Sequence, residues 1–247
     1  MVDWTERRTQ HDGVGLRYRA KGEGMPVVLL MGLALPGRMW LEPAEELVTR
    51  GYRVVVPDNR GTGGSDAPLP PYSRRTLAGD VDAVMEDAGI DAGLVVGVSF
   101  GGMVAQHVAL EYPSRVAGLM LVATTCGLPH GHLPSLGTLA LLLKSVLFPG
   151  SLSVEEAGRL LAHPDSTERL HSFLRAVERS HREEPTPLAG RLGQISAMLA
   201  HHAGSRLDQI ERPTRILAGG ADVLVPPENS EVLEARIPNS SLTVVSE

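Results

Sequence analysis

The sequence predicts an α/β fold with a mostly parallel central sheet, flanking helices and a helical cap inserted after the first half. Short apolar, β-branched runs alternate with helical patterns over residues 26–125. Such alternation implies parallel strands joined by right-handed crossovers. After this region, roughly 85 residues pass before the next apolar run, which is far longer than an ordinary connection. We therefore expect a core formed by 1–125 and 213–247, and a cap formed by 126–212.

Six runs are expected to form the parallel strands. They are continuously apolar rather than alternating, which suits a sheet that is covered on both faces. The runs are 26–30, 52–56, 94–96, 116–124, 215–218 and 241–245. An earlier run, Val14–Arg19, is expected to pair antiparallel at the edge of the sheet.

Helical periodicity fills the segments between these runs. Apolar residues recur at helical spacing over 40–48 and 77–88, and a further helix begins after Ser99. Glycine and proline separate four more helical patterns within the cap. These patterns are 139–148, 154–162, 168–179 and 188–202. The first of them is apolar nearly all round, so we expect part of it to be buried or to line an apolar pocket.

Composition excludes several classes of function. The net charge is −6 and no long run of one sign occurs, so we expect no nucleic-acid partner and no basic membrane anchor. The N-terminus is polar, and the most apolar stretch, 136–148, is too short to span a bilayer and contains Lys144. The single cysteine, Cys126, rules out an internal disulfide. We expect a cytoplasmic protein that has no cofactor.

The segment Gly97-Val98-Ser99-Phe100-Gly101 follows an apolar run and precedes a helical pattern. This is the context of a nucleophile elbow, a tight turn that places a serine in strained geometry and needs small neighbours. Ser99 is therefore our candidate nucleophile. The alternative is a chance match in an ordinary loop.

An acyl-transfer enzyme also needs backbone donors for the oxyanion. The N–H of Phe100 opens the helix after Ser99, and Met31-Gly32-Leu33-Ala34 follows the 26–30 run. We expect the N–H groups of Leu33 and Phe100 to form the oxyanion hole. The alternative for the 31–34 segment is a plain turn at the end of a strand.

Asp222 is the candidate acid. It follows the 215–218 run in a glycine turn, and Pro226 and Pro227 then begin the next helix. A carboxylate at the end of a strand can orient a histidine and stabilise its imidazolium. The alternative is that Asp222 only caps its turn.

These motifs resemble those of the α/β-hydrolase fold superfamily, and the resemblance covers nearly the whole chain. Beside the elbow, Asp58–Ser65 (DNRGTGGS) resembles the D-x-R-G-x-G-x-S loop of such proteins. The order Ser99 then Asp222 fits their Ser…Asp…His order. The resemblance implies a serine hydrolase similar to bacterial esterases. Many members carry a histidine at the position of Met31.

Two further segments resemble narrower groups within the superfamily. Gly32-Leu33 followed by Met39-Trp40 is similar to the oxyanion segment of 3-oxoadipate enol-lactonases. The segment 97–102, with Ala105-Gln106 and Tyr112-Pro113, resembles intracellular polyhydroxyalkanoate depolymerases. These motifs are specific for the superfamily but weak indicators of the substrate.

The family places its catalytic histidine in the loop after the last strand, here 241–245, and the sequence ends at Glu247. We therefore expect the natural chain to continue and to carry the base in its next loop. His107 is expected to lie about 12 Å along its helix from Ser99, out of contact. The nine histidines are interpreted as surface or cap residues. The rival bases are His130, His132, His201 and His202, and no third ligand accompanies His130 and His132 to form a metal site.

The predicted function is hydrolysis of a carboxylic ester, lactone or thioester through an acyl-enzyme. One alternative is a catalytically impaired scaffold that binds a small apolar ligand or a protein partner. Another is a perhydrolase or C–C hydrolase on the same fold. Dehalogenation is disfavoured because it uses an aspartate nucleophile, whereas this chain has Ser99.

Overall fold

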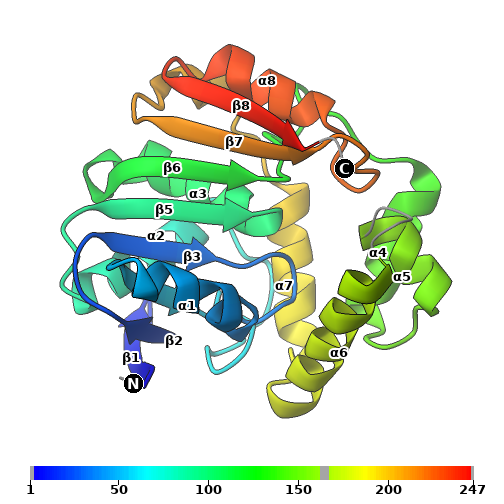
Figure 1. Cartoon of the computed structure of the whole chain (residues 1–247), viewed down its shortest axis with the longest axis horizontal. Helices are drawn as coiled ribbons and strands as arrows, with labels where there is room; N and C mark the ends of the chain where they lie inside the picture. The colour runs from blue at the N-terminus through cyan, green and yellow to red at the C-terminus, as the bar shows by residue number, and fades with distance from the viewer. Residues whose placement is uncertain (1–2, 162–166, 246–247) are drawn as a thin grey trace.

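The computed structural model describes residues 3–161 and 167–245. It contains an eight-stranded sheet with helices on both faces (Figure 1). The strands are β1 Thr5–His11, β2 Val14–Lys21, β3 Pro26–Leu30, β4 Arg53–Pro57, β5 Gly93–Val98, β6 Val116–Val122, β7 Thr214–Gly219 and β8 Ser240–Val245. The six expected parallel strands are confirmed as β3 to β8.

The strand order is β1-β2-β4-β3-β5-β6-β7-β8, and β2 pairs antiparallel with both β1 and β4. All pairs from β4 to β8 are parallel. The expectation that Val14–Arg19 lies at the edge is wrong, because β1 covers that side of β2. Strand β1 reads TERRTQH, and its side chains are mostly exposed. Charged residues on an outermost strand discourage pairing with other chains. They also leave the strand without the apolar run from which the other strands were predicted.

The helices are α1 Leu41–Thr49, α2 Arg74–Asp87, α3 Phe100–Glu111, α4 Leu136–Leu147, α5 Val154–Leu161, α6 Thr167–Glu183, α7 Leu188–Leu199 and α8 Glu228–Arg236. Short 3₁₀ helices are η1 Gly37–Trp40, η2 Pro113–Arg115 and η3 Gly204–Gln209. The larger apolar core lies between one sheet face and α2, α3, η3 and α8. A smaller core packs α1 on the other face. Burial of these two cores fixes both layers on the sheet.

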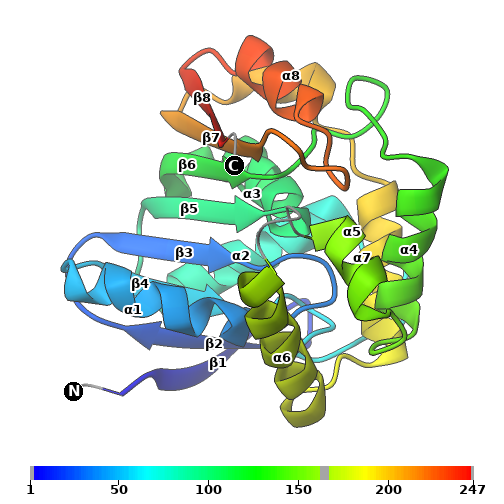
Figure 2. The ribbon, with the colours of Figure 1, turned by 45° about the vertical axis from the view of Figure 1, so that its right-hand side comes forward.

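Helices α4 to α7 belong to the segment between β6 and β7, which we call the 126–212 insertion. They lie beyond the carboxyl ends of the parallel strands, as the strand arrows in Figures 1 and 2 show. Helix α4 packs against α5 and α7. Within α4 only Val146 is fully buried, and Leu136 at its start is 86% exposed. The expected burial of the 139–148 segment is therefore limited to its inner side.

A group of ion pairs joins the end of α6 to the antiparallel edge of the sheet. Glu184 accepts hydrogen bonds from Arg17 at 2.5 Å and from Arg19 at 2.6 Å. Arg17 also donates to the buried Asp58 at 2.6 Å. Because these side chains are mostly shielded from solvent, the pairs hold their geometry better than surface pairs do.

Candidate active site

Ser99 lies between β5 and α3 in a backbone conformation that is unusual for a residue with a side chain. Its φ is 52° and its ψ is −118°. The backbone on both sides is tied to β6 and its loop: the Ser99 N–H donates to the Val122 carbonyl at 2.9 Å, and the Thr124 hydroxyl donates to the Ser99 carbonyl at 2.7 Å. These bonds hold the serine in a positive-φ turn, which is the geometry of a nucleophile elbow.

The two glycines of the motif are required by close backbone contacts. A methyl group on Gly97 would lie 2.3 Å from the Gly101 carbonyl oxygen, and one on Gly101 would lie 2.2 Å from the Leu30 carbonyl oxygen. Neither backbone oxygen can retreat as a flexible side chain would. The G-x-S-x-G spacing therefore serves a turn packed tightly against β3 and α3.

The Met31–Ala34 segment follows β3, the neighbour of β5 in the sheet. A methyl group on Gly32 would lie 3.8 Å from the Ser99 Cβ, so this segment adjoins the serine. In the described part of the chain, neither the Leu33 nor the Phe100 N–H donates a hydrogen bond. Phe100 is also the first residue of α3, where amides have no partner within the helix. Both amides are thus available to an oxyanion beside Ser99.

Asp222 lies in the turn that follows β7 and is half-buried. Its Oδ1 accepts from the Leu224 N–H at 2.9 Å and from the Val225 N–H at 2.8 Å. Burial raises the pKa of Asp222, and the two amide hydrogen bonds offset this only in part. Its other oxygen, Oδ2, accepts no hydrogen bond from the described residues and remains available to a partner.

Sheet topology sets the separation of Ser99 and Asp222. Strands β5, β6 and β7 are consecutive and parallel, so both residues lie at the same edge of the sheet. Two strand spacings correspond to about 10 Å. One imidazole with a hydrogen bond at each nitrogen spans about 8 Å between its two partner atoms, and the Ser99 and Asp222 side chains account for the remaining distance between the strands.

His107 and His201 are buried and bonded to each other, and the surface or cap interpretation fails for His107, which lies in α3 of the core. His201 Nε2 faces the Thr125 carbonyl at 3.0 Å, and its Nδ1 faces His107 Nε2 at 3.1 Å. Because a carbonyl only accepts, His201 carries its proton on Nε2 and accepts from His107. Burial lowers the pKa of His107 to about 2 and that of His201 to about 4, so both rings are neutral. Neither ring forms a hydrogen bond with Ser99 among the described residues.

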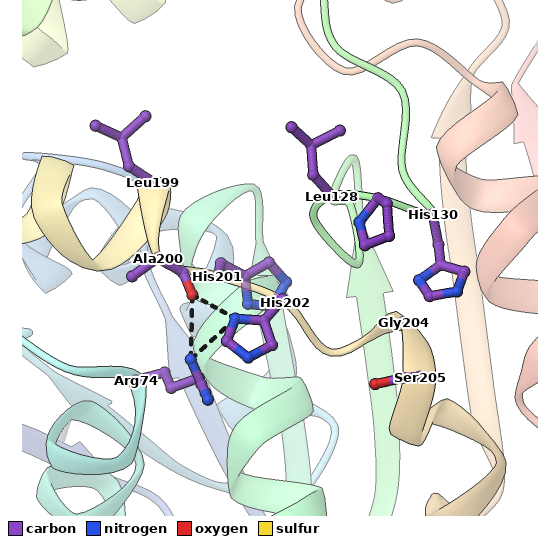
Figure 3. A pocket seen from close by; sticks show the side chains of 10 residues that line it. Arg74, Leu128, His130, Leu199, Ala200, His201, His202, Gly204 and Ser205 are labelled. Carbon is purple, nitrogen blue, oxygen red and sulfur yellow. Dashed lines mark hydrogen bonds between the residues drawn. The ribbon is translucent and has the colours of Figure 1, made fainter.

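Two other rival bases, His130 and His202, line a cavity that is separate from the candidate site. His130, His201 and His202 line a cavity of about 550 Å³ with Arg74 (Figure 3). The Arg74 guanidinium donates to His202 Nδ1 at 3.0 Å. None of the lining residues belongs to the elbow, the Met31–Ala34 segment or the Asp222 turn. The expected base after residue 247 lies outside the described residues.

His132, the last rival base, is exposed, and Asn229 binds its main-chain N–H and carbonyl. His163 lies outside the described residues. No three histidine, cysteine, aspartate or glutamate side chains come together as a metal site within 3–161 and 167–245. None of the helices in these ranges is long and apolar enough to cross a membrane.

Three polar residues beside the Met31–Ala34 segment were missed by sequence reasoning. Gln194 Oε1 accepts the Ala34 N–H at 2.8 Å, and the Thr186 hydroxyl donates to the Ala34 carbonyl at 3.0 Å. Asn59 Nδ2 donates to the Met31 carbonyl at 3.0 Å. Asn59 belongs to the 58–65 loop that the sequence motif identified, although its bond to Met31 was not predicted. Nothing in the sequence spacing marks the two insertion residues, Thr186 and Gln194.

Comparison with known proteins agrees with this geometry. The family model described as alpha/beta hydrolase fold matches residues 25–247. A RutD protein of Caulobacter vibrioides, named as a candidate carbamate hydrolase, is 33% identical over 237 residues, covering 94% of this chain and 87% of its own.

Solved structures give the same result. Est816, described as an enzyme that degrades N-acyl homoserine lactones, has 26% identity and a TM-score of 0.79, covering 97% of this chain and 91% of its own. A thermophilic esterase from Thermogutta terrifontis has 25% identity and a TM-score of 0.80, with coverages of 99% and 90%. The enol-lactonase of Burkholderia xenovorans LB400 shares the fold at 22% identity and a TM-score of 0.83, with coverages of 97% and 91%. The chain therefore belongs to the alpha/beta hydrolase fold family, as an enzyme of the hydrolase class.

Proposed function

We propose that the protein is a serine hydrolase that cleaves a carboxylic ester, lactone or thioester through an acyl-enzyme. Ser99 is the nucleophile, the Leu33 and Phe100 amides hold the oxyanion, and Asp222 orients a histidine. The observation that carries this proposal is the positive φ of Ser99 at the start of α3, with Gly32 beside it. Such strain in a residue with a side chain is concentrated at functional sites.

The proposed reaction proceeds in two halves. Ser99 Oγ bonds to the substrate carbonyl carbon while its proton passes to the imidazole, and the carbonyl oxygen becomes an oxyanion that accepts from the Leu33 and Phe100 amides. The tetrahedral species collapses, the bond to the alcohol or thiol breaks, and the imidazolium returns its proton to that group. Water then attacks the acyl-enzyme by the same route and releases the carboxylic acid and Ser99.

Asp222 fits the role of the orienting acid because one of its oxygens is already fixed. The two amide bonds to Oδ1 set the plane of the carboxyl group and leave Oδ2 for the Nδ1–H of an imidazole. A carboxylate in this role selects the tautomer that presents Nε2 to the serine and stabilises the imidazolium.

The substrate class rests on relatives and on the insertion. Proteins of similar structure are described as an esterase and as a lactone-degrading enzyme, which supports an ester or lactone as the substrate. A carbamate is the second candidate, because the 33% identity to the RutD protein extends over 94% of the chain. We further propose that the 126–212 insertion acts as a cap over Ser99 and that its inner side sets the acyl group accepted.

Two broader assignments belong to the same proposal. Residues 1–125 and 213–247 form the hydrolase core, with 126–212 as the cap domain. The protein acts in the cytoplasm, which is supported by its single cysteine, Cys126, being free and buried.

The test is covalent labelling by a fluorophosphonate probe, followed by peptide mapping and an activity screen. We expect a single adduct on Ser99 that is lost in Ser99→Ala and retained in Ser205→Ala, a change at an exposed serine of η3. The screen covers p-nitrophenyl esters of increasing chain length, N-acyl homoserine lactones, thioesters and aryl carbamates. In a protein with its natural C-terminus, no adduct and no turnover would favour the ligand-binding scaffold instead. An adduct without ester turnover would direct the screen to perhydrolysis and C–C hydrolysis.

A further inference from the structure

The Met31–Ala34 segment is held by side chains from two other parts of the chain. Ala34 has a φ of 58°, which a residue with a side chain adopts only when its surroundings enforce it. Both sides of this residue are bound by the insertion: Gln194 accepts its N–H and Thr186 donates to its carbonyl. Asn59 holds the other end of the segment at the Met31 carbonyl.

Gln194 lies in α7 and is completely buried. Its Nε2 donates to the Arg60 carbonyl at 3.0 Å while its Oε1 accepts the Ala34 N–H. The chemistry fixes the orientation of the amide, because an N–H only donates and a carbonyl only accepts. One side chain of the insertion therefore bridges the candidate oxyanion segment and the 58–65 loop.

The seating of α7 depends on a contact between two glycines. A methyl group on Gly190 would lie 2.0 Å from the Gly61 carbonyl oxygen, and one on Gly61 would lie 2.6 Å from the Gly190 Cα. Gly61 also has a φ of 89°. Because neither position has a Cβ, the first turn of α7 rests directly on the 58–65 loop, and Gln194 follows one turn later.

We propose that Gln194 is a positioning residue for the oxyanion hole, so that helix α7 of the insertion is part of the catalytic machinery. The inference rests on the proposed function. Binding of the Ala34 N–H fixes the peptide that joins Leu33 to Ala34, and Asn59 fixes the peptide that joins Met31 to Gly32. The peptide between them, which carries the Leu33 N–H, then has both neighbours held and a fixed direction.

The effect of removing the Gln194 side chain is limited by what one oxyanion donor, the Leu33 N–H, contributes to kcat. Loss of a whole oxyanion donor costs about 10²–10³ in kcat. Gln194 does not touch the substrate, so Gln194→Leu misdirects the Leu33 N–H rather than deleting it. We therefore expect kcat to fall about 10- to 100-fold, which is at or below the lower limit for loss of a whole donor. KM should change by less than about threefold.

Ser196→Ala is the matched control. Ser196 lies on the same helix, and its hydroxyl accepts the Tyr72 N–H at 3.0 Å, so its removal also breaks a bond between the insertion and the core. It does not touch the Met31–Ala34 segment. Both variants should lower the melting temperature, whereas only Gln194→Leu should lower kcat per active site titrated with fluorophosphonate.

A transition-state analogue supplies the readout that a merely structural role would not change. A trifluoromethyl ketone forms a tetrahedral adduct whose oxygen occupies the oxyanion hole, so its affinity should fall by the same factor as kcat/KM. Equal analogue affinity and equal kcat per titrated site in Gln194→Leu and the wild type would overturn the proposal. If the wild type neither reacts with fluorophosphonate nor hydrolyses esters, the proposed function fails instead.

Gln194→Glu keeps the test decisive if Gln194→Leu does not fold. A protonated glutamic acid reproduces both bonds, because its carbonyl oxygen accepts from Ala34 and its O–H donates to Arg60. An ionised carboxylate can only accept hydrogen bonds, so its oxygen and the Arg60 carbonyl oxygen repel each other. The ratio of variant to wild-type kcat should therefore fall as pH rises. A ratio that is independent of pH would overturn the proposal.

Discussion

Replacement of Ser99 by glycine should make the protein more stable while abolishing its activity. A non-glycine residue in a sparsely populated backbone region costs about 1–3 kcal/mol, and glycine adopts a positive φ freely. Glycine also adds freedom to the unfolded chain, which opposes the gain by about 0.4–1 kcal/mol. The Ser99 hydroxyl donates no hydrogen bond within the described residues, so its removal leaves no partner unpaired there. The expected net gain is about 0.5–2 kcal/mol in the free energy of unfolding.

Ser99→Ala isolates the contribution of strain. Alanine retains the Cβ and hence the strained backbone, so its stability should stay close to that of the wild type, although turnover is lost in both variants. For a chain of this length, 1 kcal/mol corresponds to about 2–4 °C in melting temperature. Ser99→Gly should therefore melt about 1–8 °C above Ser99→Ala in calorimetry, and urea unfolding should give the same order.

Ser205→Gly is the control for the substitution itself. Ser205 is exposed and lies in η3, where glycine should only destabilise, by roughly 0.5–1 kcal/mol. If Ser99→Gly were no more stable than Ser99→Ala, Ser99 would not be strained. The elbow would then lose the observation on which the proposed function depends.

Three further outcomes are expected. Asp222→Asn should leave the fold intact and lower kcat by about 10⁴, as in the serine-protease triad, because the histidine takes the wrong tautomer; a drop of less than tenfold would mean that another acid orients the base. Burial raises the pKa of Glu184, but its two arginine partners lower it by more, to a net value below the usual 4.5. The stabilisation that ionised Glu184 gives the folded state is therefore complete above the unfolded-state pKa of 4.5, and it is lost as pH falls through the lower folded-state pKa. In urea titrations between about pH 5 and 3, the wild type should lose stability more steeply than Glu184→Gln. Leu142→Ala and Leu143→Ala in α4 should alter chain-length preference by up to about 1–3 kcal/mol in kcat/KM per methylene removed, and a strong loss of melting temperature with unchanged preference would assign these residues to packing alone.

Local patterns predicted most of the fold because each parallel strand is a short apolar run between turn residues. The six parallel strands correspond to such runs, and the helices of the insertion correspond to segments with helical periodicity between glycine and proline residues. Strand β1 was not predicted because an exposed outer strand needs no apolar side chains, and all seven of its residues are polar. The position of β2 followed from that omission, since without β1 it would be the outermost strand.

The candidate site likewise contains residues that the sequence predicted and residues that it did not. Ser99, Gly97 and Gly101 belong to one turn, so their spacing along the chain records their geometry directly. Gln194 contacts Ala34 across 160 positions of sequence, and His107 contacts His201 across 94. No periodicity links residues so far apart, because their meeting depends on how α7 packs on the 58–65 loop and on α3. A buried glutamine with both ends bonded is visible only once the surrounding backbone is in place.

The order of strands supports the proposed acyl transfer at this edge of the sheet. Strand β3 lies on one side of β5 and brings Gly32 against Ser99, while β6 and β7 lie on the other side and bring Asp222 two strands away. The proposed oxyanion segment and the proposed acid therefore lie on opposite sides of the serine. Over the end of β6, the chain turns away at Ala123, a small residue with a φ of 44° whose N–H donates to the Leu217 carbonyl. In the proposed mechanism, an imidazole that takes a proton from Ser99 and is oriented by Asp222 must lie between these two residues, over the end of β6.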